Sequence, residues 1–155
     1  MNQLEEIGYL LVVKPEDEES TDPIQFIAIY KSKELANIAL KTQKVKEIED
    51  FLNYTYDSED VVKYCQREDT QPPHVIVAQK LDDIDNNEEQ WRWIKFCEKN
   101  TTWTKYQDSG WFYNVKKTII EGDGEILDRV FREAFNITGT DSYRVTVELH
   151  EVPIL

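Results

Sequence analysis

Residues 7–13 read IGYLLVV, an uninterrupted apolar run rich in strand-forming side chains, and Lys14-Pro15 ends it. A run without polar alternation is typical of a strand that is buried on both faces of a sheet. Residues 24–30 read IQFIAIY and indicate a second strand. Because only the polar, acidic residues 16–23 separate the two runs, we expect them to form a hairpin.

The end of the chain carries the clearest alternation. Apolar and polar residues take turns from Tyr143 to His150, with the apolar ones at the odd positions. A period of two predicts a strand with one packed face and one solvated face.

Helices and further strands fill the region between these strands. Apolar residues at helical spacing predict five helices, over about residues 32–42, 45–52, 58–65, 88–99 and 125–135. Strand-forming residues predict three more strands, over residues 74–81, 102–107 and 111–120, the last two joined through Asp108-Ser109-Gly110. Strands and helices do not alternate strictly, which favours an α+β fold. We therefore expect a single domain over residues 1–155, a mostly antiparallel sheet of about five to six strands, and helices packed on one face.

Composition supports a folded domain without covalent or metal cross-links. The chain has 155 residues, of which 12% are aromatic, enough to bury a sizeable core. The two cysteines, Cys65 and Cys97, both lie in helical patterns, and we expect reduced thiols. The first six residues are acidic and unlike a signal peptide, and the longest apolar run is too short to span a bilayer, so we expect a cytoplasmic protein.

The charge balance is the strongest functional signal. Thirty-one acidic residues face 18 Lys and Arg, which gives a net charge of −13. Such a field repels phosphate and disfavours direct binding to nucleic acid or to an anionic membrane. It favours a basic protein partner, although acidic residues also promote solubility and the charge could serve that alone.

No motif for catalysis, cofactor binding or metal binding emerges. A Cys–His pair could only join Cys65 or Cys97 to His74 or His150, and no strained or glycine-rich turn displays either thiol. Counting a calcium loop from Asp83 fails at two positions that such a loop requires. We therefore predict no enzyme, no cofactor and no metal.

Acidic segments and aromatic residues are the predicted partner-binding groups. The acids lie in the first hairpin loop, before the helix at residues 88–99 and in the first turn of that helix, and two tryptophans could supply an apolar anchor. The predicted binding residues are Glu16, Asp17, Glu18, Glu19, Asp22, Asp82, Asp83, Asp85, Glu88, Glu89, Trp93 and Trp111.

These features predict an acidic binding protein that neutralises a basic partner. Carboxylates held at phosphate-like spacing complement a Lys/Arg groove, so the partner would be a nucleic-acid-binding or nuclease-like protein. Immunity proteins and anti-defence proteins of the anti-CRISPR, anti-restriction or DNA-mimic kind work in this way. Two alternatives remain open, an enzyme without a readable motif, for instance one using Cys65 with His74, and a scaffold component of a bacterial or phage complex. The sequence leaves the oligomeric state open.

Overall fold

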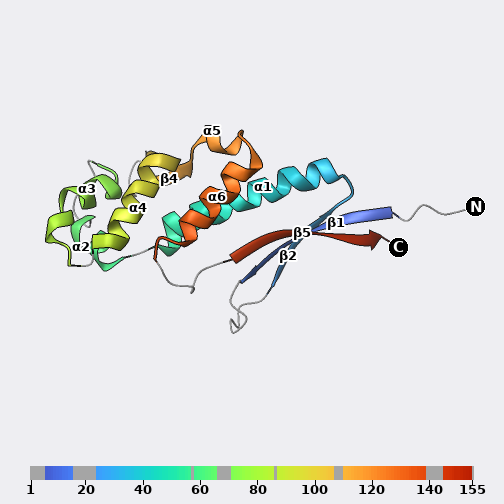
Figure 1. The fold of residues 1–155 in the computed structure, drawn as a ribbon, viewed down its shortest axis with the longest axis horizontal. Coiled ribbons are helices and arrows are strands. Elements are labelled where there is room, and N and C mark those ends of the chain that lie inside the picture. Colours follow the sequence, from blue (N-terminus) through green and yellow to red (C-terminus); the bar gives the residue numbers. More distant parts are fainter. Residues whose placement is uncertain are drawn as a thin grey trace, which may run out of the picture. The chain divides into compact units, whose positions relative to one another are not determined.

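The computed structural model describes residues 6–15, 24–56, 58–65, 71–85, 87–106, 110–138 and 145–154. Within these ranges the fold is α+β, with two antiparallel sheets and six α-helices (Figure 1). The chain divides into two compact units, a first unit of Met1–Lys44 with Thr140–Leu155 and a second unit of Val45–Gly139. The single domain expected from the sequence stays a prediction.

A three-stranded antiparallel sheet forms the first unit, in the order β2-β1-β5. Its strands are β1 (Glu6–Pro15), β2 (Gln25–Tyr30) and β5 (Val145–Ile154). Strands β1 and β2 pair as the predicted hairpin. Leu11, Val12 and Val13 on the central strand are all no more than 6% exposed. Because consecutive side chains point to opposite faces, β1 is buried on both faces, as predicted.

Two polar residues of the predicted alternation, Glu148 and His150, interact on strand β5. Glu148 bonds to His150 Nε2 at 2.9 Å and pairs with Lys14 Nζ of the neighbouring strand at 3.2 Å. Val147, one position along, is 7% exposed and belongs to the core. Val145 and Leu149 are half-buried, as are Thr146 and Glu148, so the predicted strand is present but its burial follows the alternation only in part over the described residues.

Helix α1 (Lys33–Asp50) is continuous, so the predicted break at residues 42–44 is wrong. Neither Pro nor Gly lies in that stretch to end a helix, and the Thr42 hydroxyl donates back to the carbonyl of Ile38 at 3.0 Å. The helix then widens into a π-helical turn, η1 (Phe51–Thr55).

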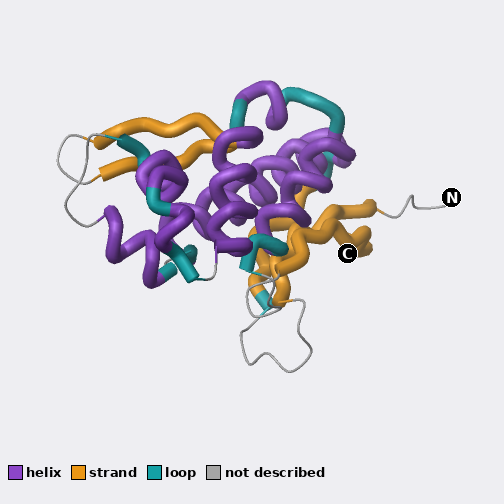
Figure 2. Tube along the Cα trace, turned by 60° about the vertical axis from the view of Figure 1, so that its left-hand side comes forward, coloured by secondary structure: helices purple, strands orange, loops and turns teal. Residues whose placement is uncertain are grey.

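The strand predicted over residues 74–81 is also wrong, because Pro73–Gln79 forms helix α3. A short apolar run does not distinguish a buried strand from a buried helix. Pro73 decides here, because proline at the first helical position has its φ already set and lacks only an N–H that would have no partner. Five strands therefore form two sheets, of three and two strands, rather than one sheet of five or six (Figure 2).

The second unit is mostly helical. Besides α3 it contains α2 (Glu59–Cys65), the 3-10 turn η2 (Leu81–Asp83), α4 (Asn87–Asn100), β3 (Thr101–Tyr106), β4 (Gly110–Val115), α5 (Lys117–Ile120) and α6 (Gly124–Phe135). The predicted hairpin is present as β3 and β4, although β4 ends five residues early and α5 takes the remainder. Gly110 has φ +92°, a left-handed conformation that favours glycine at the end of the turn.

Side chains, rather than a third strand, form hydrogen bonds with backbone N–H and C=O groups on the outer edge of β4. The Asn53 amide both donates to the Tyr113 carbonyl, at 2.9 Å, and accepts from its N–H, at 2.8 Å. Glu49 accepts the N–H of Val115 at 3.0 Å. These bonds explain how a two-stranded sheet is stable next to η1 without further strands.

Candidate functional site

Five of the predicted binding residues lie close together along the chain in residues 82–85 and 87–89, which we call the acidic segment. Asp82 and Asp83 form the end of η2, and Glu88 and Glu89 lie in the first turn of α4. Between them Ile84 is 4% exposed and anchors the segment in the core. Asp82, Asp83, Asp85 and Glu88 are exposed and Glu89 is half-buried.

The acidic segment keeps its negative charge largely uncompensated. It contains no Lys or Arg, and the described base paired with it is Arg92, whose Nη1 lies 3.3 Å from Glu88. The dipole of α4 favours carboxylates in its first turn. Local helix electrostatics therefore help to hold the acids of the segment in place.

The other predicted binding residues have different outcomes. Glu16, Glu18, Glu19, Asp17 and Asp22 lie outside the described residues. Trp111 is half-buried on β4. Trp93 is 2% exposed and its ring packs against Tyr56 and Tyr113, at centroid distances of 5.3 and 6.3 Å. In this structure Trp93 is a core residue and presents no surface to a partner.

Trp91 is the exposed tryptophan of α4, at 46%. From the sequence we expected Trp93, rather than Trp91, to be available to a partner, and the burial of the two side chains is the reverse. The buried positions include Gln90, Trp93, Ile94 and Cys97, which follow the helical spacing of three and four residues. Counting that spacing backwards from Cys97 would have identified Trp93 as the core residue.

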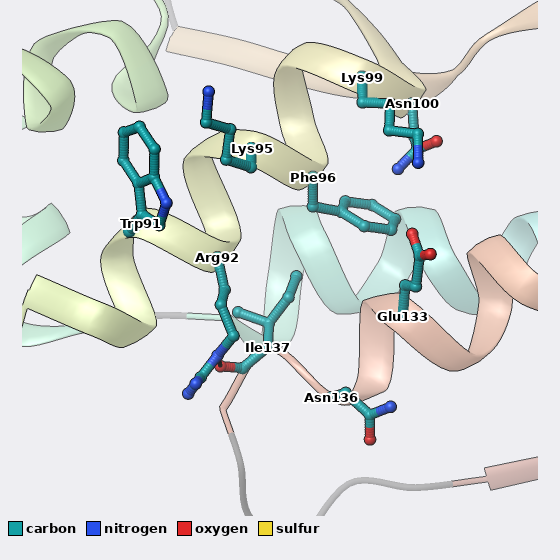
Figure 3. A pocket seen from close by; sticks show the side chains of 9 residues that line it. All are labelled: Trp91, Arg92, Lys95, Phe96, Lys99, Asn100, Glu133, Asn136 and Ile137. Atoms are coloured by element: carbon teal, nitrogen blue, oxygen red, sulfur yellow. Dashed lines mark hydrogen bonds between the residues drawn. The ribbon is translucent and has the colours of Figure 1, made fainter.

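A cavity of about 380 Å³ lies between α4 and the C-terminal end of α6 (Figure 3). Sequence reasoning missed this cavity, which we call the Trp91 pocket. It is lined by apolar and basic side chains with one acid, namely Trp91, Arg92, Lys95, Phe96, Lys99, Asn100, Glu133, Asn136 and Ile137. Three cations and one carboxylate give this lining a net positive charge, in a chain whose own net charge is −13.

Several contacts fix the shape of the Trp91 pocket. Lys95 Nζ lies 4.4 Å from the centroid of the Trp91 ring, a cation–π contact. Arg92 Nε donates to the Ile137 carbonyl at 3.1 Å, which ties α4 to the turn after α6. Asn100 is 2% exposed, and its Nδ2 has no hydrogen-bond partner among the described residues.

His74 is part of a buried hydrogen-bonded cluster. The Tyr113 hydroxyl accepts the N–H of His74 at 3.0 Å and lies 2.9 Å from its Nδ1. Tyr113 can then donate its own proton to Nδ1, which leaves the ring proton on Nε2. The Trp103 ring contacts the His74 ring edge-on, with 4.5 Å between the two ring centroids. Burial lowers the pKa of His74, with a smaller opposing effect from Glu98, so the ring is neutral near pH 7.

The surroundings of the two cysteine thiols indicate a structural role. Cys97 is fully buried, and burial raises its pKa well above the ordinary value. Cys65 Sγ is 3.8 Å from the Pro73 carbonyl. Over the described ranges no group of three or more His, Cys, Asp or Glu could hold a metal ion.

The burial of His74 predicts a pH dependence of stability. Its pKa is lower in the folded than in the unfolded protein, so below about pH 6.5 the unfolded state binds more protons. We expect the free energy of unfolding to fall as the pH drops below that value. Urea denaturation between pH 7.5 and 5 would measure it. His74→Phe should remove this component, and His150→Gln, at an exposed position, should leave it; an identical pH profile for His74→Phe would contradict the assignment.

Comparisons with known proteins assign the chain to no family. No protein-family model matches the sequence, and no curated protein and no solved structure matches it significantly. In the part of the chain that the structure describes, no helix has the length and apolar character needed to cross a membrane.

Proposed function

We propose that the protein is a non-enzymatic binding protein that neutralises a basic protein partner, with the acidic segment as its contact surface. One observation carries the proposal. Exposed carboxylates of the segment stand on η2, at Asp85 and on the first turn of α4, next to the buried Ile84.

Order matters because association has an entropic cost. A flexible acidic tail would lose conformational freedom on binding, whereas carboxylates on a fixed backbone lose less. Their charge also steers a basic partner toward the surface and raises the association rate. The net charge of −13 extends this attraction over the whole chain.

The chemistry indicates the class of partner. A groove of Lys and Arg that normally holds phosphates would accept these carboxylates and be blocked by them. We infer a nucleic-acid-binding or nuclease-like partner, and a role as an immunity or anti-defence protein of the DNA-mimic kind, acting in the cytoplasm. Trp91 follows Glu88 by three residues on α4 and is 46% exposed, so it replaces Trp93 as the proposed aromatic anchor.

Capture from a lysate of the source cell tests the proposal. Immobilised protein should retain a basic protein at 50 mM NaCl and release it at 500 mM, because ion pairs at an exposed surface are screened by salt. An immobilised protein of similar negative charge but unrelated sequence serves as the control. If the bait captures no basic protein at low salt, or the same proteins as the control, the proposal fails.

A further inference from the structure

We propose that the Trp91 pocket binds a small aromatic anion, a molecule with a planar apolar body and a carboxylate or phosphate head group. The pocket shares Trp91 with the proposed contact surface, and its Arg92 pairs with Glu88 of the acidic segment, but the ligand proposal rests on cations and on a buried amide rather than on carboxylates.

Asn100 provides the most specific argument. Its side chain is almost completely buried, yet Nδ2 has no hydrogen-bond partner among the described residues. Buried polar groups in folded proteins are nearly always bonded, and an orphaned donor is costly. Because Asn100 lines the pocket, an acceptor oxygen of a ligand placed there would satisfy Nδ2 once the side chain rotates to bring this buried atom to the pocket surface.

The charge of the lining selects an anion. Arg92, Lys95 and Lys99 line the pocket with one carboxylate, that of Glu133. Arg92 is also paired with Glu88 outside the lining, so Lys95 and Lys99 are the main cations for a bound anion. Lys95 and Lys99 lie on the exposed surface of α4, so their ammonium groups can reach a bound oxyanion. A local excess of cations is unusual in a protein of net charge −13, and we infer from it that the pocket attracts an anion.

The apolar lining and the volume limit the size of the ligand. Phe96 and Ile137 are buried and line the cavity, and the half-exposed Trp91 ring lies at its rim. A volume of about 380 Å³ is at the lower end of ligand sites, which span roughly 300–1,000 Å³. A one-ring molecule fits this description better than a nucleotide with several phosphates.

Glu133 further limits which head groups the pocket can bind. In Figure 3 its carboxylate extends from α6 toward the Asn100 amide on α4, with the Phe96 ring beside both. A head group that carries both an acceptor for Asn100 and a proton for Glu133 suits this pair. Glu133→Gln should therefore tighten the binding of a fully ionised anion.

Phenyl phosphate and benzoate are the probes, and NMR titration of the ¹⁵N-labelled full chain is the readout. We expect saturable shifts of the Asn100 side-chain amide with at least one probe at millimolar concentration or below, and the tighter probe identifies the head group. Benzamidine, a cation with the same ring, and inorganic phosphate, which lacks the ring, should bind at least about 10-fold more weakly.

Variants link the binding to this pocket. Asn100→Asp replaces the donor by a negative charge and should weaken binding by about 10-fold or more. Lys99→Gln, at an exposed position that does not threaten the fold, should weaken it about threefold or more, whereas Lys117→Gln outside the pocket should not change it. Equal binding of benzamidine, or an affinity unchanged in Lys99→Gln, would overturn the proposal even if Asn100→Asp failed to fold.

Discussion

Trp93→Ala is expected to lower the free energy of unfolding of the second unit by about 3–5 kcal/mol. The ring is 2% exposed and contacts Tyr56 and Tyr113. Removing it leaves a cavity that the neighbours after η1 and on β4 fill only in part, in addition to the lost burial of a large apolar side chain. A loss of this size is a large fraction of the stability of a typical domain, about 5–15 kcal/mol.

Urea denaturation followed by far-UV circular dichroism measures this loss. Trp91→Ala, on the same helix but 46% exposed, is the matched control and should cost less than about 1 kcal/mol. The assignment of Trp93 to the core would be contradicted if both variants lost the same stability, or if Trp91→Ala lost more.

Neutralising the acidic segment is expected to weaken partner binding by about 100-fold. The variant carries Asp82→Asn, Asp83→Asn and Asp85→Asn, which remove three exposed charges and keep the side-chain volumes. At about 1 kcal/mol for each charge pair lost, the total corresponds to a factor of about 100 in Kd. Isothermal titration calorimetry with the captured partner measures the change.

A control variant with the same change in net charge separates the effect of where the acids lie from the effect of net charge on affinity. Glu121→Gln, Glu125→Gln and Asp128→Asn also remove three exposed acids from the second unit, but in the turn after α5 and on α6. This control should change Kd by less than about threefold, the residual effect of long-range steering. Equal weakening in both variants would mean that net charge alone, and not the acidic segment, attracts the partner.

Regular patterns in the sequence predicted most of the elements that the structure contains. The alternation in residues 143–150 and the apolar run at residues 7–13 both gave strands, because burial on a sheet imposes these periods. Glu88 and Glu89 were correctly expected in the first turn of a helix, since the preference of a helix start for acids is local.

The errors fall where a short pattern fits two structures, as at Pro73, or where the outcome depends on packing between distant residues. The run at residues 74–77 is apolar enough for a strand, but it became a helix that buries His74 against Tyr113, 39 positions away. The Trp91 pocket was invisible in the sequence because α4 and the end of α6 are far apart along the chain. Asn100 is an ordinary helix-terminal residue in the sequence, and only its burial makes its amide conspicuous.

The salt dependence of the Kd for the captured partner tests the central claim most directly, when the chain and its Asp82/Asp83/Asp85→Asn variant are compared between 50 and 500 mM NaCl. If the ordered acidic segment makes the ion pairs, log Kd should rise steeply with log salt for the unaltered chain and less steeply for the variant, and the two affinities should converge at high salt. Parallel lines of equal slope and equal affinity would contradict the proposed contact surface.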